Sequence, residues 1–180
     1  MDMTTCIKER RSIRTFQNDK ISHEAFEELV SLASFAPSWK NTQTARYTLV
    51  EDDAAIQYLA DNCVMDFEFN ANTLRRTPNI VVLTTVNGRC GYERDGSFST
   101  PKKDSWEMFD AGVAAQTFCL AAHAQGYGTV IMGIFDEEKI HDYLKLPEGQ
   151  TVSTIIALGR PAESPAAPKR KETAELIDYR

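Results

Sequence analysis

The sequence predicts an α+β protein in which helices flank a central mixed or antiparallel sheet. Two apolar, largely β-branched runs, residues 79–86 and 152–158, are typical of strands buried on both faces. Residues 105–125 are apolar around most of a helical circumference, which predicts a helix buried in the core or between subunits. Helical and strand patterns do not alternate regularly as βαβ units, and this favours a layered α+β structure over a doubly wound one.

Caps and periodicity predict the other elements. Ser22 is suited to cap a helix with apolar residues at positions 26, 29, 30 and 33, and Pro37 is expected to end that helical pattern. Further helices are expected at 53–63, 136–144 and 172–179, and short strands at 46–50 and 129–134. Residues 87–104 are rich in turn-forming residues and form either a mobile surface loop or a lid over a site. Residues 162–168, rich in proline and alanine, are expected to be an extended connector.

Size and charge restrict the class of protein. A chain of 180 residues suits one domain, residues 1–180. A formal net charge of −6 argues against nucleic-acid binding, which depends on neutralising many phosphates. The most apolar stretch, residues 113–124, is too short to span a membrane and contains Gln116 and His123.

Cysteine and histidine usage argues against disulfides and metal. The four cysteines are scattered without a C-x-x-C pair, and the first residues do not resemble a signal peptide. Reduced thiols and a cytoplasmic location are therefore expected. None of the three histidines lies near a cysteine, so we expect no metal site. His123, within an apolar helix, is expected to be a hydrogen-bonded core residue.

Basic residues gather in two short segments of this acidic chain. Residues 8–14 read Lys-Glu-Arg-Arg-Ser-Ile-Arg, and we call them the N-terminal basic segment; residues 169–171 read Lys-Arg-Lys and form the C-terminal basic segment. If the first segment were helical, Arg10 and Arg14 would share a face. Guanidinium groups bind phosphate oxygens through paired hydrogen bonds. A phosphate site and a plain solvated face both fit the segment alone, and the solvated face is the more common outcome.

A second candidate region, residues 36–43, directly follows the helix that Pro37 ends. Ser38, Asn41 and Gln43 can donate and accept hydrogen bonds, while Trp39 offers a flat face. These groups suit a planar heteroaromatic ligand, and they equally suit an ordinary helix-to-strand loop. The chain contains no G-x-G-x-x-G or G-x-x-x-x-G-K-[ST] motif, so neither glycine-rich nucleotide site is supported.

Taken in order, these residues resemble the FMN-dependent nitroreductase family over nearly the whole chain. No single motif is specific, but their order and spacing together are. The matching segments are Arg10-Arg11-Ser12-Ile13-Arg14-Thr15-Phe16, Ala36-Pro37-Ser38-x-x-Asn41-x-Gln43, Phe69-Asn70, Asp110-x-Gly112-x-x-x-Gln116, Gly126-Tyr127-Gly128-Thr129, Gly133-Ile134-Phe135-Asp136 and Leu158-Gly159-Arg160-Pro161.

The resemblance implies the nitroreductase fold and FMN bound at the interface of an interlocked homodimer. It assigns the FMN phosphate and ribityl chain to Arg10, Arg11, Ser12 and Arg14, completed by Lys169 or Arg170. It implies that the partner subunit contributes Pro37, Ser38, Trp39 and Asn41 near the flavin ring. It places Asn70 at the pyrimidine edge of the ring, and the backbone N–H groups of Met132 and Gly133 at flavin N5 and O4.

The activity implied is electron transfer from NADH or NADPH, through FMN, to a small-molecule acceptor such as a nitroaromatic or quinone. Because the flavin carries the chemistry, no side chain is predicted as a catalytic acid or base. Alternatives are dehalogenation, flavin breakdown or a non-catalytic flavin-binding dimer. The substrate stays open because the sequence departs from the family pattern. Thr44-Ala45 replaces a common Pro-Trp, Trp39 replaces a smaller residue, and Thr73 stands where some relatives have lysine.

Overall fold

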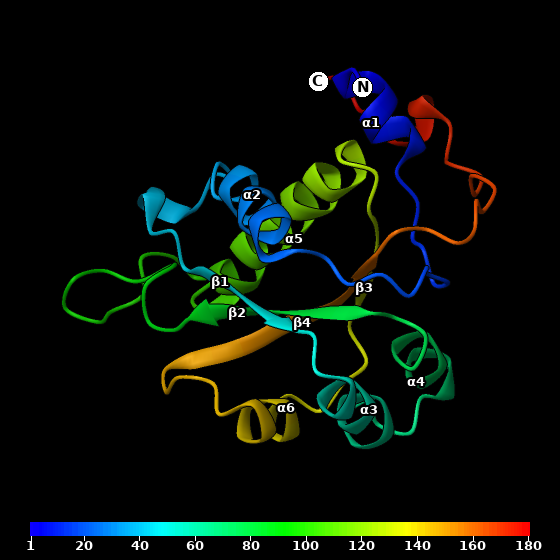
Figure 1. Ribbon diagram of the computed structural model, residues 1–180. Coiled ribbons are helices and arrows are strands. Elements are labelled where there is room, and N and C mark those ends of the chain that lie inside the picture. The colour runs from blue at the N-terminus through cyan, green and yellow to red at the C-terminus, as the bar shows by residue number, and fades with distance from the viewer.

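A four-stranded antiparallel sheet forms the centre of the protein in the computed structural model, which describes all residues from 1 to 180 (Figure 1). The strands are β1 (Ala45–Val50), β2 (Asn79–Val86), β3 (Gly128–Met132) and β4 (Gln150–Gly159), in the spatial order β1-β2-β4-β3. Every neighbouring pair is antiparallel. The predicted α+β class is therefore confirmed, and the sheet is antiparallel throughout.

Helices cover both faces of this sheet (Figure 1). On one face lie α2 (His23–Ala33) and the long α5 (Ser105–Ala124); on the other lie α3 (Asp53–Asn62), α4 (Glu68–Leu74) and α6 (Glu137–Leu144). A short helix, α1 (Met3–Glu9), packs against α5, and the Cys6 thiol contacts the Leu120 carbonyl at 3.5 Å. Ser22 caps α2 as predicted, and Asp136 caps α6; each side chain accepts the backbone N–H of the residue three positions later.

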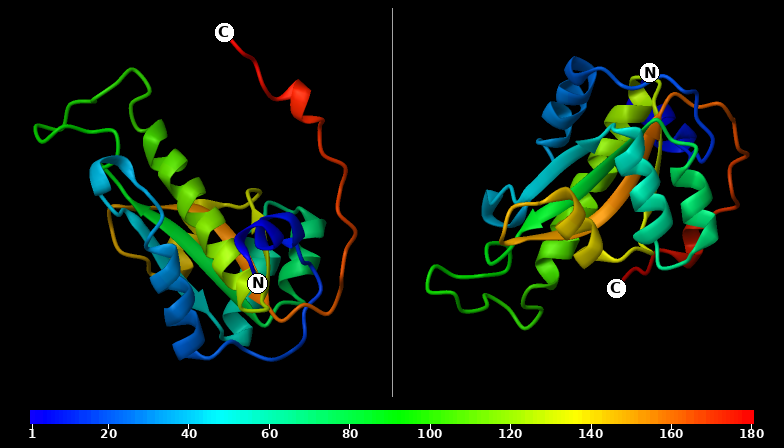
Figure 2. Two further views of the ribbon diagram at one scale, coloured as in Figure 1. Left: turned by 90° about the horizontal axis from the view of Figure 1, so that it is seen from above. Right: turned by 60° about the horizontal axis from the view of Figure 1, so that its bottom comes forward.

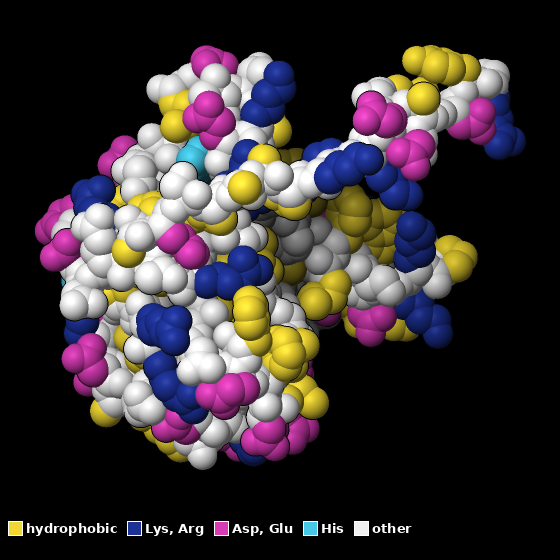
Figure 3. Space-filling model, turned by 90° about the vertical axis from the view of Figure 1, so that its right-hand side faces the viewer, with side chains coloured by type: hydrophobic (Ala, Val, Ile, Leu, Met, Phe, Trp, Pro, Cys, Tyr) yellow, Lys and Arg dark blue, Asp and Glu magenta, His cyan; other side chains and the backbone are white.

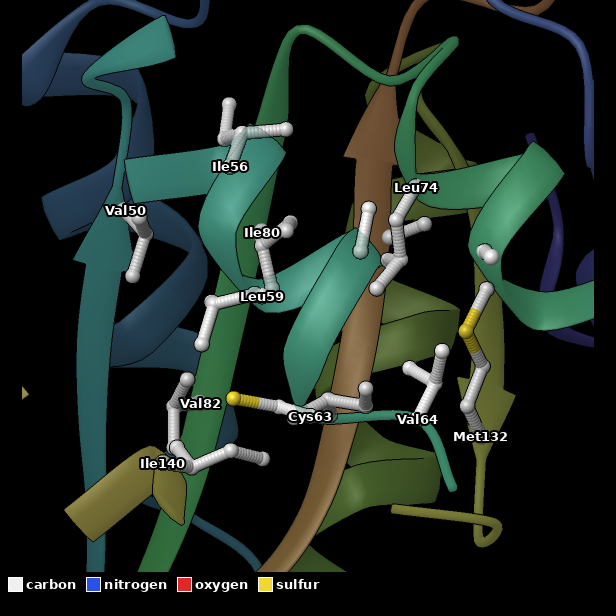
Figure 4. Close-up of a cluster of buried hydrophobic side chains, with 14 of the residues drawn as sticks. Val50, Ile56, Leu59, Cys63, Val64, Leu74, Ile80, Val82, Met132 and Ile140 are labelled. Carbon is white, nitrogen blue, oxygen red and sulfur yellow. The ribbon is translucent and has the colours of Figure 1, made fainter. Parts of the chain in front are cut away.

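Strands β2 and β4 supply both sides of the core because their residues alternate between the two faces. Ile80 and Val82 face α3, α4 and α6, within the apolar cluster shown in Figure 4. Val81 and Leu83 face α2 and α5, where Phe118 is fully buried. This two-sided burial confirms the interpretation of residues 79–86 and 152–158 as strands with no solvent-exposed face.

The structure corrects several predicted elements. No helix covers residues 172–179; only a single 3-10 turn, η2 (Thr173–Glu175), forms there. Helices α1 and α4 were not predicted. The strand expected at 129–134 ends at Met132. Helix α5 forms as predicted, and within one chain its residues Met108 and Phe109 are 57% and 61% exposed. Arg10 to Arg14 are not helical, because α1 ends at Glu9 and the chain then runs extended.

The last twenty residues leave the body of the molecule as an extended arm (Figure 2). Leu176, Ile177 and Tyr179 are exposed on this arm, Tyr179 to 88%. The predicted connector at 162–168 forms part of it and has no helix or strand. No helix in the structure is both long enough and apolar enough to cross a bilayer.

Candidate functional site

A basic hollow lies between the N-terminal basic segment and the C-terminal arm. Its volume is about 350 Å³. Figure 3 shows dark blue Lys and Arg side chains along the arm and beside the hollow beneath it. The lining residues are Arg10, Arg11, Ser12, Arg14, Pro165, Ala166, Pro168 and Arg170. The two basic segments are thus brought together across about 160 residues of sequence.

Strand β3 and the arm hold the N-terminal basic segment in place. Ser12 forms a parallel bridge with Thr129, and the Ile13 N–H donates to the Thr129 carbonyl at 3.0 Å. Gly128 allows this close approach, because a Cβ built there would lie 2.7 Å from Ile13 Cγ1. The Glu163 carboxylate accepts the backbone N–H groups of Arg14 and Thr15. The arm therefore fixes the segment from the opposite side.

The guanidinium groups of this hollow are available to an anion. Arg11 Nη1 donates to the carbonyls of Lys8 at 2.6 Å and Arg10 at 2.9 Å, which leaves its other N–H donors free. Arg14 stacks over the Phe69 ring at 5.3 Å. None of the four arginines forms an ion pair. Four unpaired guanidiniums around one hollow favour a multiply charged anion such as phosphate.

His123 on α5 lies close to this basic segment and differs from the prediction. Its Nε2 atom is buried without a hydrogen-bond partner, so the expectation of a hydrogen-bonded core histidine is wrong. Burial, reinforced by the positive charges of Arg10 and Arg11, lowers the pKa of His123. The neutral imidazole is therefore the favoured form near pH 7.

A second part of the candidate site continues from Arg14 along α4 to the end of β3. Asn70 is 7% exposed, and its Nδ2 donates to the Ile134 carbonyl at 3.1 Å, which leaves Oδ1 free to accept. Gly133 follows the last residue of β3, Met132, and a Cβ built at Gly133 would meet no atom within 4 Å. A planar ligand can therefore approach the backbone at Gly133 closely.

The loop containing Pro37, Ser38, Trp39 and Asn41 lies elsewhere. It includes the 3-10 turn η1 (Trp39–Asn41) and borders α2, β1 and the N-terminal half of α5. Pro37 and Ser38 line a separate hollow of about 350 Å³, which shares no residue with the basic hollow. Figures 1 and 2 show η1 and α1 near opposite ends of α5.

The distance between the two groups can be estimated along α5. The Trp39 N–H contacts Asp110, whereas the N-terminal basic segment is close to His123. Asp110 and His123 are thirteen residues apart, about 20 Å at the usual rise of a helix. The predicted site residues therefore fall into two groups, and within one chain they do not form a single pocket.

Sequence reasoning missed part of this arrangement. Lys169 does not line the basic hollow, whereas Arg170 does. Glu163 and the prolines of the arm had no predicted role, because nothing local indicates that the arm folds back over residues 10–14. Asp110 was recognised only as part of a motif, yet it is the buried contact of the Trp39 loop.

The fold and these surfaces define a class of α+β protein that has a basic hollow next to an antiparallel sheet. The comparisons identify the family. The model of the nitroreductase family matches residues 7–160, and the chain belongs to that family.

Individual relatives are similar over most of their length. A protein of Archaeoglobus fulgidus is 27% identical over 168 residues, and the match covers 89% of this chain and 88% of that protein. Its name proposes an NADH dehydrogenase or NAD(P)H nitroreductase. A Desulfovibrio desulfuricans protein solved in complex with FMN is 26% identical, with a TM-score of 0.77 and coverage of 98% and 95%. A protein of Exiguobacterium sibiricum, also solved with FMN, has a TM-score of 0.84 at 20% identity over 100% and 98% of the chains and supports the fold.

Proposed function

We propose that this protein is an FMN-dependent oxidoreductase that takes electrons from NADH or NADPH and passes them to a small-molecule acceptor. The observation that carries the proposal is the basic hollow, in which Arg10, Arg11, Arg14 and Arg170 have no acidic partner. The FMN found with the relative from Desulfovibrio desulfuricans and the NAD(P)H in the name of the Archaeoglobus relative support the same reading.

The residues present fit FMN from its phosphate to its ring. The hollow offers guanidiniums and the Ser12 hydroxyl to a phosphate dianion. Farther along, the free Oδ1 of Asn70 is suited to accept an imide N–H at the pyrimidine edge of the ring. The open side of Gly133 admits a flat ring beside the backbone. Bound FMN would supply the redox chemistry between donor and acceptor, while the protein supplies position and hydrogen bonds.

We further propose that the working unit is a homodimer with FMN at the interface. The two groups of site residues are separated within one chain, so a ligand that touches both requires two copies. Exposed apolar side chains support this assembly: Met108 and Phe109 on α5, and Leu176 and Ile177 on the arm. Nitroaromatics and quinones are the proposed acceptors, because flat apolar rings can stack near Trp39 of the η1 loop.

The test is anaerobic absorbance spectroscopy of purified protein supplied with FMN and then with NADH or NADPH. We expect flavin to be retained through gel filtration, and its absorbance to bleach with at least one nucleotide. Nitrobenzoate or a naphthoquinone should then restore the absorbance. Flavin that is retained without bleaching would identify a passive binder, and failure to retain FMN would contradict the proposal.

A pair of variants locates the phosphate site. Arg10→Ala/Arg14→Ala should weaken FMN binding at least about tenfold, since each charge-assisted hydrogen bond contributes roughly 1.5–3 kcal/mol. Arg76→Ala/Arg94→Ala removes the same charge from positions outside both hollows and should bind FMN normally. Equal affinity in the two variants would exclude Arg10 and Arg14 from the site.

A further inference from the structure

The loop around Trp39 adopts an unfavourable backbone conformation that other parts of the molecule must stabilise. Lys40, Asn41 and Gln43 have positive φ angles of 44°, 56° and 49°, although none is glycine. In the same segment, the Trp39 Nε1 and Thr42 Oγ1 atoms are buried without partners. Conformations of this kind persist where surrounding contacts determine them, and they are concentrated at ligand sites.

Asp110 provides the buried contact that this loop needs. The residue is 7% exposed, and its Oδ2 atom accepts hydrogen bonds from the backbone N–H of Trp39 at 2.7 Å and from the Cys90 thiol at 2.9 Å. Asp110 forms no ion pair. Burying a carboxylate without a cation is costly, and hydrogen-bond donors offset that cost. Burial and the adjacent carboxylate raise the pKa of Cys90 to about 12, so this thiol keeps its proton and remains a donor.

The same helix face also holds the 87–104 loop. Glu107, three residues before Asp110 and on the same side of α5, accepts the Gly88 N–H at 2.7 Å. Lys40 and Glu93 form an ion pair at 2.9 Å that joins the 87–104 loop to the Trp39 loop. The indoles of Trp39 and Trp106 then meet with ring centroids 4.9 Å apart. Asp110 also contacts both loops, and unlike the exposed Glu93 its carboxylate is buried and accepts the backbone N–H of Trp39 itself.

We propose that Asp110 is a positioning residue that fixes Trp39 against Trp106. The two indoles then form a rigid aromatic wall beside the flavin ring of the partner subunit, and this wall favours planar aromatic acceptors. The assignment of the wall to the acceptor rests on the proposed function; the positioning of Trp39 by Asp110 does not. Flat rings stack on such a wall, whereas compact ions gain nothing from it.

The chain has only two tryptophans, and both belong to this wall, so spectroscopy reports on it directly. In FMN-free protein, the coupled indoles should give an exciton couplet in circular dichroism. Asp110→Leu keeps the branched shape of the side chain but removes the acceptor, and we expect the couplet to fall at least threefold. Asp110→Asn keeps a carbonyl oxygen for the Trp39 N–H and should restore most of the signal.

Glu107→Leu is the matched control, because it releases Gly88 and leaves the Trp39 N–H paired. Its couplet should stay close to that of the unmodified protein. An unchanged couplet in Asp110→Leu, or an equal loss in Glu107→Leu, would overturn the positioning role. If Asp110→Leu does not yield folded protein, Asp110→Ser, whose hydroxyl is too short to reach both donors, takes its place with the same outcomes.

The FMN-loaded enzyme tests the acceptor wall. In Asp110→Leu, the KM for a naphthoquinone should rise at least fivefold, while the KM for ferricyanide, a compact ion, changes less than twofold. Equal changes for both acceptors would refute a wall that favours planar rings. If the protein retains no flavin, the proposed function fails, and the couplet of the FMN-free variants still decides whether Asp110 positions Trp39.

Discussion

Gly133 allows a test of ligand contact that is largely free of folding effects. A Cβ built at this residue meets no atom within 4 Å, and Gly133 is not among the glycines with positive φ. Gly133→Ala therefore creates no clash within the chain. Replacing glycine at a compatible position restricts the unfolded chain and stabilises a protein by about 0.4–1 kcal/mol. We expect the free energy of unfolding of the FMN-free protein to stay the same or rise by up to that amount.

FMN binding should respond in the opposite direction. If the flavin ring lies against the backbone at Gly133, the added methyl group occupies space that the ring needs. Overpacking of this kind costs about 1–3 kcal/mol, which corresponds to roughly a 5- to 150-fold weaker Kd at about 1.4 kcal/mol per tenfold. Urea unfolding gives the stability of the variant, and quenching of FMN fluorescence gives its Kd.

Gly112→Ala is the control for effects on the surrounding surface. Gly112 on α5 lines the same small hollow as Gly133, and its added Cβ also meets no atom within 4 Å. Gly112 has no assigned contact with FMN, so the Kd of the Gly112→Ala variant for FMN should be unchanged. An unaltered Kd in Gly133→Ala, or equal weakening in both variants, would refute a flavin contact at Gly133. Gel filtration of each variant shows whether assembly has changed.

Two further predictions concern the support of the basic hollow. Gly128→Ala places a methyl group within 3.1 Å of three Ile13 atoms. The variant should be less stable by about 1–3 kcal/mol in urea unfolding. An unchanged urea midpoint of unfolding would contradict the close approach. The pKa of His123 is lowered in the folded protein, so just below pH 6.5 the unfolded state binds more protons than the folded state. The free energy of unfolding should therefore fall as the pH drops through that range. His123→Gln should reduce this fall between pH 7.5 and 5.5, and an identical pH dependence in both proteins would show that His123 does not contribute.

The parts of the fold that were predictable have strong local patterns. Strands β2 and β4 are apolar on both faces, so their sequences are continuous apolar runs. Ser22 and Asp136 are of residue types that cap helices. Helix α4 escaped prediction because it is short and buries the polar residues Asn70 and Thr73 beside apolar ones, which hides a helical period. Helix α1 has one buried residue, Cys6, and hence almost no apolar face to detect.

The helix expected at 172–179 was wrong for a thermodynamic reason. Isolated helices shorter than about 12–15 residues are marginal in water, and tertiary packing normally stabilises them. Within one chain, Leu176 and Tyr179 have no surface to pack against and stay exposed. Local sequence indicates the amphipathic pattern, but it does not indicate whether a partner surface exists.

The candidate site was predictable as a set of residues and not as an arrangement. Residue types made the arginines and the Ser38 loop candidates, and the family resemblance assigned them to one site, yet the spatial separation of these two groups depends on how α5 and the sheet place them. Contacts such as Asp110 to Trp39 join residues 71 positions apart. No local pattern reports such contacts, because they arise only when α2, α5 and the 87–104 loop pack together.

The separation of the two groups has a thermodynamic consequence for the proposed dimer. In the proposed dimer, the basic hollow belongs to a single chain, whereas the η1 loop would reach the flavin only from the other copy. A ligand that binds the dimer more tightly than the monomer stabilises the dimer by mass action. FMN retention and dimerisation are then linked, and dilution that separates the subunits also removes the ring contacts and leaves mainly the phosphate held. In this proposed arrangement, the arginines would set how strongly the cofactor is anchored to each chain, and the second copy would determine whether its ring is placed for reaction.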